Sequence, residues 1–549
     1  MQLRDYQETG IAAIYGAWES VQNVMYVLPT GGGKTAVFSA VTKAHQGHSV
    51  LIAHRGEIVS QISLTLARAG IRHNIIASEA VRRNCIAVQM AELNISYYNP
   101  QAMCTVAGVD TLVRKDANDS WMKRVSLIVQ DEAHHVLREN KWGYAASLFP
   151  NAKGLYPTAT PTRADGKGLG RHADGLMDVL IQGPSGRYLV NEGYLTDYRI
   201  FAPPSDLDLS TVTLSAGGDY SPPKLRNAVH KSHIMGDVVS HYLKLAPGKL
   251  GVTFAVDIEA AIEIAQAFKQ SGVCAEVISS KTPDVTRHYI MRRFRNREIL
   301  QLVNVDLLGE GVDVPAIEVV SMARPTCSFA LFSQQFGRAL RPLEGKDYAI
   351  IIDHVGNVVR HGLPDAPRIW TLDRQDRRTR SGPLDVVPVR ACLNIQCMLV
   401  YERTKSQCPY CGFKPEPAAR SAPEFVDGDL CEMDPLALAK LRGEIERIDR
   451  AAYVPQGLIS AARGALIKNH SNRQEAQQTL RDRIALWAGY HRQLNKPDSE
   501  IYRLFYFLFG TDVMTAQTLN SGDASALQLQ IEQRLAIDNV DNRAYTEKL

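Results

Sequence analysis

The feature that most constrains the fold of this chain is the segment Pro29–Thr35, which reads Pro-Thr-Gly-Gly-Gly-Lys-Thr. It follows the apolar run Val24–Leu28 and precedes a helical pattern, which is the setting of a phosphate-binding P-loop. Glycines let backbone N–H groups turn toward phosphate oxygens, and the helix N-terminus adds a favourable partial charge. We therefore expect Lys34 to contact the β- and γ-phosphates of a nucleotide and Thr35 to bind Mg²⁺. The loop residues expected beside them are Thr30, Gly31, Gly32 and Gly33. The alternative is a Gly-rich turn without a ligand.

A pair of carboxylates supplies a second part of such a site. The sequence Asp-Glu-Ala-His at 131–134 follows the apolar run 127–129, so it lies at the end of a predicted strand. One carboxylate there can hold Mg²⁺, usually through water, and the next can orient the attacking water. We assign Asp131 to the metal and Glu132 to the water.

Two arginines supply a third part. Arg338 and Arg341 lie three residues apart in the segment 334–341, so we expect them on one face of a helix. Arginine suits bidentate phosphate contact and the charge that develops on a transferred γ-phosphate. The alternative is a structural pair on a surface helix. Because both lie far from the P-loop in sequence, a shared site requires a nucleotide held between two domains.

The strand pattern supports two such domains. Apolar β-type runs alternate with helical stretches from Val24 to about Arg199, and again from about Gly251 onward. Short runs buried on both faces and separated by helices predict parallel sheets. The fold class that we expect is α/β, with two tandem parallel-sheet domains, a small metal module and an all-α C-terminal domain.

A cysteine cluster predicts the metal module. Cys392, Cys397, Cys408 and Cys411 are spaced x4, x10 and x2, and glycine follows the last. Four thiolates in a closed set are typical of structural Zn²⁺. Redox cysteines and an iron–sulfur cluster are the alternatives. The N-terminus leaves no room for a signal peptide, and the most apolar run, Leu504–Phe509, is far shorter than the ~20 residues of a membrane span. We therefore expect a cytoplasmic protein without a membrane partner. The net charge of +4 permits a polyanionic partner without requiring one.

Taken together, these motifs resemble those of superfamily 2 helicases of the DEAD/DEAH-box kind. The resemblance covers roughly residues 1–365. Its further motifs are 3–7 (the adenine-reading Q motif), 51–61 (motif Ia), 158–161 (motif III), 252–255 (motif IV), 309–315 (motif V) and 334–341 (motif VI). Within the superfamily the chain looks most like RadD-like helicases and phage-encoded replication or repair helicases. The points of likeness are the early Q motif, Asn304–Asp306, Asp353–Asn357 and the cysteine cluster.

The resemblance implies two RecA-like domains that use ATP and Mg²⁺. It implies that Gln7 reads adenine and that Gly311, Asp313 and Gln334 add nucleotide contacts. The strand-contact positions that it implies are Arg55, Thr111, Thr160 and Gly309. The expected function is an ATP-dependent DNA helicase or translocase in DNA replication, recombination or repair, in a bacterial cell or phage-infected host, acting on single-stranded or forked DNA. Three alternatives stay open: a duplex translocase like restriction-enzyme motor subunits, an RNA helicase, and a scaffold with an inactive motor. The complete catalytic set argues against the last.

The predicted domain boundaries are 1–200 and 236–370 for the two α/β domains, 390–414 for the zinc module and 436–549 for the helical domain; the linkers are 201–235, 371–389 and 415–435. In the helical domain, aromatic residues stand beside arginine in two stretches, 472–494 and 498–509. They either form the core of that domain, stack on single-stranded bases, or dock a replication or recombination protein.

Overall fold

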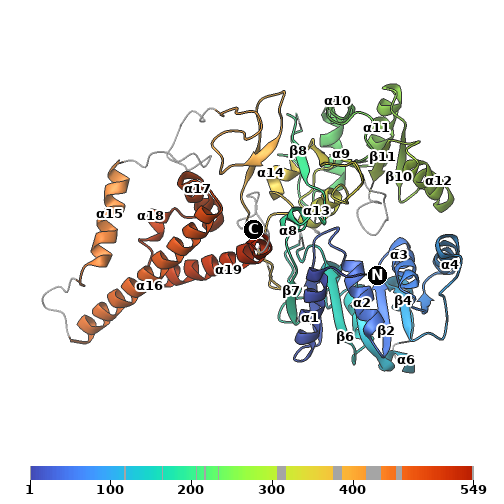
Figure 1. Ribbon diagram of the computed structural model, residues 1–549, viewed down its shortest axis with the longest axis horizontal. Coiled ribbons are helices and arrows are strands. Elements are labelled where there is room, and N and C mark those ends of the chain that lie inside the picture. Colours follow the sequence, from blue (N-terminus) through green and yellow to red (C-terminus); the bar gives the residue numbers. More distant parts are fainter. Residues whose placement is uncertain are drawn as a thin grey trace. The chain divides into compact units, whose positions relative to one another are not determined.

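The computed structural model describes residues 2–546 apart from 117–118, 164, 206, 216–217, 233, 306–316, 375–385, 416–434 and 453–459. The chain divides into two compact units, which Figure 1 shows as ribbons. Unit 1 comprises Met1–Asp365 and Trp370–Ser381, and unit 2 comprises Ala366–Ile369 and Gly382–Leu549. The expected fold class is confirmed, because unit 1 contains two parallel sheets and unit 2 contains a cysteine cluster and a helical region.

The first sheet has seven strands among the described residues, in the order β3-β4-β2-β5-β6-β1-β7, and all of its pairings are parallel. The strands are β1 (Asn23–Val27), β2 (His48–Ala53), β3 (His73–Ile76), β4 (Cys104–Gly108), β5 (Val125–Gln130), β6 (Lys153–Thr158) and β7 (Val179–Gln182). The accompanying helices are α1 (Asp5–Trp18), α2 (Lys34–Ala44), α3 (Gly56–Arg68), α4 (Glu79–Leu93), α5 (Val109–Leu112), α6 (Ser120–Arg124), the 3₁₀ helix η1 (Ala133–His135), α7 (Lys141–Ser147) and α8 (Gly186–Asn191). All five residues of β1 are buried, as expected for a strand with elements on both faces.

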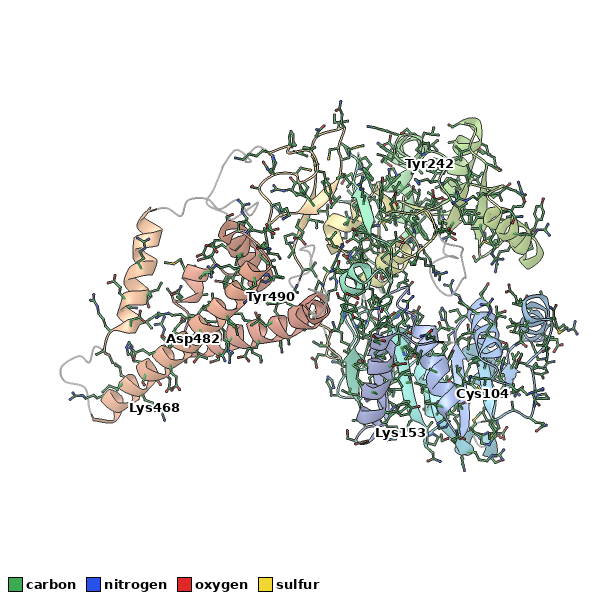
Figure 2. The ribbon with its side chains drawn as sticks, in the orientation of Figure 1. Cys104, Lys153, Tyr242, Lys468, Asp482 and Tyr490 are labelled. Atoms are coloured by element: carbon green, nitrogen blue, oxygen red, sulfur yellow. The ribbon has the colours of Figure 1, made fainter. Side chains whose placement is uncertain are left out.

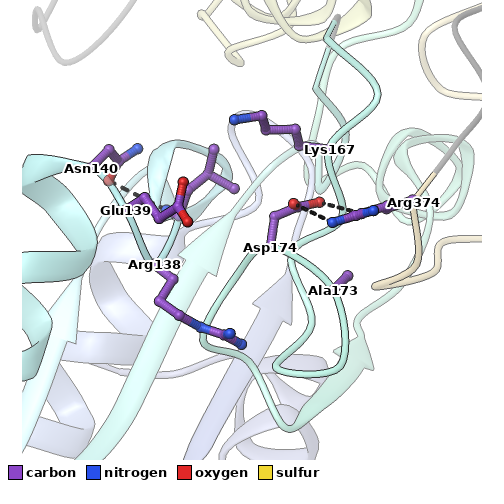
Figure 3. Close-up of a pocket in the computed structure, with 8 residues that line it drawn as sticks. Arg138, Glu139, Asn140, Lys167, Ala173, Asp174 and Arg374 are labelled. Atoms are coloured by element: carbon purple, nitrogen blue, oxygen red, sulfur yellow. Dashed lines mark hydrogen bonds and ion pairs between the residues drawn. The ribbon is translucent and has the colours of Figure 1, made fainter.

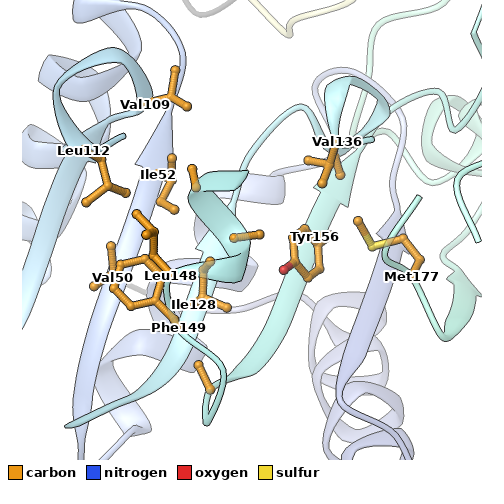
Figure 4. Close-up of a cluster of buried hydrophobic side chains, with 14 of the residues drawn as sticks. Val50, Ile52, Val109, Leu112, Ile128, Val136, Leu148, Phe149, Tyr156 and Met177 are labelled. Carbon is orange, nitrogen blue, oxygen red and sulfur yellow. The ribbon is translucent and has the colours of Figure 1, made fainter. Parts of the chain in front are cut away.

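A continuous apolar core fixes this sheet (Figure 4). Ile52 on β2, Ile128 on β5 and Tyr156 on β6 belong to it together with Phe149. Each fully buried apolar side chain of this size contributes about 1.5–3 kcal/mol. The core therefore holds the strand ends, and the loops that leave them, in a fixed arrangement. Leu372, far away in the sequence, belongs to the same core.

The second sheet has the order β10-β11-β9-β12-β13-β8 in the part of the chain that the structure describes. Its strands are β8 (Tyr198–Phe201), β9 (Gly251–Phe254), β10 (Ala275–Ser279), β11 (Gln301–Val305), β12 (Val319–Met322) and β13 (Ala349–Asp353). Its helices are α9 (Pro222–Lys231), α10 (Ile234–Leu245), α11 (Ile258–Gln270), α12 (Asp284–Arg295), α13 (Phe329–Gly337) and α14 (Asn357–His361).

The position of β8 differs from the sequence-based expectation. The predicted first domain ends at residue 200, yet β8 pairs in parallel with β13 of the second sheet. Ala349 N donates to Asp197 O at 2.7 Å, and the ring of Tyr198 packs edge-on against Phe336 at 4.8 Å. These contacts draw the strand to the second sheet before the Pro-rich break that suggested the boundary.

The first strands of unit 2 among the described residues are the short antiparallel pair β14 (Val389–Ala391) and β15 (Val400–Glu402). The helices α15 (Pro435–Asp449), α16 (Ser460–Gln493), α17 (Asp498–Phe509), α18 (Val513–Ala516) and α19 (Ser521–Thr546) follow. Trp487 and Phe505 lie at the centre of their core, which confirms the core interpretation for these two aromatics. Tyr490 on α16 (Figure 2) donates its hydroxyl to Asp538 O at 2.7 Å. Within the described ranges, no helix combines the length and apolar character needed to cross a bilayer.

Candidate nucleotide and metal sites

The strand order brings the predicted catalytic segments to one edge of the first sheet. β5, β6 and β1 are neighbours in that order, and they run parallel. The segments that leave their carboxyl ends therefore lie side by side, which is where ligands bind in open α/β sheets. These segments carry the P-loop after β1, Asp131 and Glu132 after β5, and Thr160 after β6. Leu28 N also donates to Thr158 O at 3.0 Å, which ties the start of the P-loop to the end of β6.

The P-loop needs its glycines for two reasons. Gly31 and Gly33 both have φ of +86°, a conformation that side chains disfavour. A methyl group added at Gly31 would come within 2.8 Å of Cδ2 of Leu195, and one added at Gly33 would collide with Nε2 of Gln7. Helix α2 begins at Lys34 directly after Gly33. The loop therefore delivers the N–H groups of a helix N-terminus to the sheet edge, as phosphate binding requires.

Gln7 is buried beneath this loop. Its Oε1 accepts from Arg4 N at 3.0 Å, and its Nε2 donates to Gly32 O at 3.1 Å. Tyr6 donates its hydroxyl to the same carbonyl at 2.8 Å. The Arg4 guanidinium lies 4.5 Å from the ring centre of Tyr194. The adenine-reading role of Gln7 stays a prediction, and the structure adds that α1 supports the P-loop through Gln7 and Tyr6.

The backbone at Glu132 has an unusual conformation. Glu132 has φ 52° and ψ 51°, in the left-handed region, although it is not a glycine. Such a conformation costs of order 1–3 kcal/mol and is common at functional sites. Asp131 Oδ1 accepts from Glu132 N at 2.9 Å, which stabilises the turn. The result is a buried carboxylate whose direction is set by the backbone.

His134 connects this turn to the segment after β6. Its Nδ1 lies 3.5 Å from Glu132 Oε2 and 3.2 Å from Thr158 Oγ1. Thr158 Oγ1 in turn donates to Thr160 O at 3.2 Å, and Arg163 Nη1 donates to His134 O at 3.0 Å. The acidic motif and the Thr-Ala-Thr-Pro segment therefore form one hydrogen-bonded assembly.

Arg338 and Arg341 are not on a helix face, so that prediction is wrong. Helix α13 ends at Gly337, and the following turn is held by bonds of the i to i+3 kind, such as Leu340 N to Gly337 O at 3.3 Å. A methyl group added at Gly337 would come within 2.6 Å of Cγ2 of Thr30. The end of α13 therefore lies directly against the P-loop and brings the arginine turn beside it. Arg338 is buried, as is Gln334 on α13.

The predicted strand-contact positions are distributed over neighbouring strand ends. Arg55 precedes α3 after β2, Thr111 is on α5 after β4, and β2 and β4 are adjacent. Both side chains are half-buried, whereas Thr160 is buried. Gly309, Gly311 and Asp313 lie outside the described residues.

The four clustered cysteines converge in unit 2. Their sulfur atoms all lie within 4.8 Å of one another. The Cys392 and Cys411 sulfurs are 3.5 Å apart, and those of Cys397 and Cys408 are 3.8 Å apart. Sulfurs at about 2.3 Å from a tetrahedral Zn²⁺ lie about 3.8 Å from each other, so the donor set fits zinc. Asn394 Nδ2 lies 3.9 Å from Cys411 Sγ, which is the position of an outer donor to a thiolate.

A cavity of about 340 Å³ lies elsewhere in unit 1, beside the loop that follows the acidic motif (Figure 3). Its lining includes Arg138, Lys167 and the pair of Asp174 with Arg374, whose atoms approach to 2.8 Å. None of the residues of the P-loop lines it. This cavity is therefore not the nucleotide site.

Comparison with known proteins finds two family models that match segments of unit 1. The family model described as "Type III restriction enzyme, res subunit" matches residues 1–163, and "Helicase conserved C-terminal domain" matches residues 236–342. A "51.5 kDa protein" of a Lactococcus phage (isolate 7-9) is 31% identical over 393 residues, which cover 70% of this chain and 76% of that protein. The "Putative ATP-dependent helicase IRC3" of Saccharomyces cerevisiae is 28% identical over 400 residues, 68% of this chain and 54% of that protein. The chain thus spans about half the length of this yeast relative.

Among solved structures, the DNA-bound ATP-dependent Type ISP restriction-modification enzyme LlaBIII is similar, with a TM-score of 0.44 at 16% identity over 65% of this chain and 28% of that one. From the family models and the sequence relatives, the chain belongs to the superfamily 2 helicases. It is an ATP-hydrolysing enzyme of that family.

Proposed function

We propose that this enzyme is a DNA helicase or translocase that couples ATP hydrolysis between its two parallel-sheet domains to movement on DNA during replication, recombination or repair. The observation that carries the proposal is the contact of Gly337 with Thr30, which brings the arginine turn of the second domain to the P-loop of the first. A motor of this kind needs a nucleotide that both domains contact, so that hydrolysis changes their relation. The mildly basic chain is compatible with a polyanionic track.

Each residue of the site has a proposed role. Thr35 and Asp131 hold Mg²⁺, which neutralises phosphate charge and positions the γ-phosphate. Lys34 contacts the phosphates, and Glu132 orients the attacking water from its fixed backbone position. Arg338 and Arg341 stabilise the charge that develops on the transferred γ-phosphate. Further nucleotide contacts come from Gln7, Gly311, Asp313 and Gln334, and strand contacts come from Arg55, Thr111, Thr160 and Gly309.

Steady-state ATPase measured with several nucleic acids tests this function. The full-length protein is compared without nucleic acid and with single-stranded DNA, duplex DNA, forked DNA and RNA. We expect at least tenfold stimulation by one DNA form, and we expect Glu132→Gln to lower the stimulated rate by roughly 10²–10⁴-fold because it removes a general base. Lys34→Ala is the second inactive control. Stimulation by RNA but not by DNA would establish an RNA helicase instead.

A translocase without strand separation is a second candidate. The match of residues 1–163 to a restriction-enzyme subunit favours it. A motor of this class hydrolyses ATP on duplex DNA and displaces a triplex-forming strand, yet leaves a forked duplex intact. Release of a labelled strand from the forked duplex would show strand separation and so support the helicase.

We also propose that the cysteine cluster holds a structural Zn²⁺ on Cys392, Cys397, Cys408 and Cys411. Apart from these sulfurs, the described part of the module buries a few apolar side chains, namely Met398, Leu399, Val400 and Tyr401. A core of this size is too small to fold such a short segment alone. Bound Zn²⁺ would therefore supply the folding free energy of the module. The proposed location is the cytoplasm, and the helical domain is the proposed docking site of a replication or recombination protein.

A further inference from the structure

A row of ring-shaped and charged side chains lies next to the acidic motif, and none of them has a role in the function proposed above. His54, which directly precedes Arg55, has its ring centre 5.4 Å from that of His135. His135 is the last residue of η1. Its ring is 4.1 Å from that of His134 and stacks on Trp142 at 5.3 Å with an angle of 21°. His135 is therefore the central member of the row.

The row continues from Trp142 toward the end of β4. Lys141 Nζ lies 4.7 Å from the ring centre of Trp142 and forms an ion pair with Asp110 at 2.7 Å. Asp110 is on α5, next to Thr111. Two of the proposed strand-contact positions, Arg55 and Thr111, are thus each one residue away from a member of the row.

The other end of the row reaches the catalytic carboxylate. His134, in ring contact with His135, has Nδ1 at 3.5 Å from Glu132 Oε2 and 3.2 Å from Thr158 Oγ1. Glu132 is the N-cap of η1, so its backbone and the direction of its carboxylate depend on where η1 lies. A displacement of His135 would therefore change the orientation of the Glu132 carboxylate.

The segment between His135 and α7 is held together by hydrogen bonds and close packing. Asn140 Nδ2 donates to His135 O at 2.7 Å, and Asn140 Oδ1 accepts from Trp142 N at 3.1 Å and Gly143 N at 3.0 Å. A methyl group added at Gly143 would collide with the carbonyl of Leu137. Close packing of this kind transmits displacements instead of absorbing them.

We propose that His135 is a positioning residue that couples strand contact at Arg55 and Thr111 to the orientation of Glu132, through His54 and Trp142 on one side and His134 on the other. His135 touches neither nucleotide nor strand in this scheme. The inference rests on the proposed function, because it assumes that a strand engages Arg55 and Thr111. Coupling between two sites typically amounts to a factor of 5–150.

The test compares basal and strand-stimulated ATPase of full-length variants, with an oligothymidine strand and a forked duplex as probes. For His135→Ala we expect basal kcat and the Kd for the oligothymidine strand to stay within about twofold, while the stimulated kcat falls about tenfold. His135→Phe keeps a ring between His54 and Trp142, so it should restore most of the stimulation. Lys141→Ala removes the ion pair with Asp110 at a partly exposed side chain and should lose part of the stimulation. His172→Ala, an exposed histidine of the same unit, is the matched control.

The outcomes separate the two proposals. A wild-type protein without stimulation by any nucleic acid overturns the proposed function and the coupling with it. A wild type that is stimulated, with His135→Ala stimulated equally, overturns the coupling alone. Equal loss of basal and stimulated rates in His135→Ala and His135→Phe would show that His135 supports the fold and does not couple the sites. If His135→Ala does not fold, full stimulation in Lys141→Ala refutes the pathway, and its partial loss supports it.

Discussion

At the scale of single residues, Gln7 illustrates how a predicted ligand contact has a second role in the fold. Its amide bridges Arg4 N and Gly32 O, so it supports the P-loop from below. We expect Gln7→Ala to raise KM for ATP several-fold and to lower the free energy of unfolding by about 1–3 kcal/mol, because a buried amide and carbonyl lose their partners. ATP titrations of the ATPase rate and thermal unfolding measure both effects.

Tyr6→Phe is the matched control for Gln7. It removes the other donor to Gly32 O and keeps the ring beneath the loop. A smaller loss of stability with an unchanged KM is the expected result. An unchanged KM in Gln7→Ala as well would contradict any role of Gln7 at the nucleotide.

At the scale of elements, the turn after α13 depends on one lysine. Lys346 Nζ donates to the carbonyl oxygens of Ile317 at 2.8 Å, Arg341 at 2.9 Å and Ala339. Burial lowers the pKa of Lys346 from 10.5 to about 8. Lys346→Met leaves these carbonyls without a shared donor and loosens the turn that carries both arginines. We expect kcat to fall about 10- to 100-fold with a nearly unchanged KM for ATP, because misplacement of catalytic groups acts on the rate.

The lowered pKa of Lys346 also predicts a pH dependence. Above pH 8 the neutral amine has two hydrogens for three carbonyls, so the ATPase rate of the wild type should decline from about pH 8 upward. An ordinary lysine would stay charged until beyond pH 9. Lys346→Arg keeps its charge throughout this range and should extend the plateau of a pH–rate profile. Parallel profiles for the two proteins would mean that another group titrates.

These elements also show what the sequence can predict. Local sequence patterns correctly place Lys34 after a buried strand, and Asp131 and Glu132 at the end of another. The alternation of apolar runs correctly predicts two parallel sheets. The end of α13 at Gly337 could not be predicted from the sequence, because the helical pattern continues past this residue. The close approach of Gly337 to Thr30 depends on how the two sheets pack. The strand β8 is missed for a similar reason, since a four-residue strand before a Pro-rich break gains its partner only in three dimensions.

At the scale of the whole molecule, the chain returns to the first sheet after it has completed the second. Leu372 O accepts from Leu169 N and Gly170 N, both at 2.9 Å, and its side chain belongs to the core of the first sheet. Trp370 packs against that core. The centre of its ring lies 6.1 Å from that of Phe329, which is on α13 beside the second sheet. The intervening residues Ala366–Ile369 belong to unit 2, where Arg534 Nη1 donates to Pro367 O at 3.0 Å. Trp370 and Leu372 therefore belong to the fold of unit 1, although the sequence predicts that a linker begins at residue 371.

Two truncated chains test this conclusion directly. A chain that ends at Ser381 retains Trp370 and Leu372, so we expect it to unfold cooperatively and to keep its basal ATPase. A chain that ends at Ile369 loses both side chains and should be less stable by at least the 2–5 kcal/mol typical of a single large buried truncation. In the full-length protein, Leu372→Ala should reproduce about half or more of that loss in chemical denaturation. Arg374→Ala, at an exposed side chain, should leave the unfolding midpoint nearly unchanged. Equal stability of the two truncated chains would instead mean that the first sheet is complete without this segment. The burial of Leu372 would then add little to the free energy of unfolding.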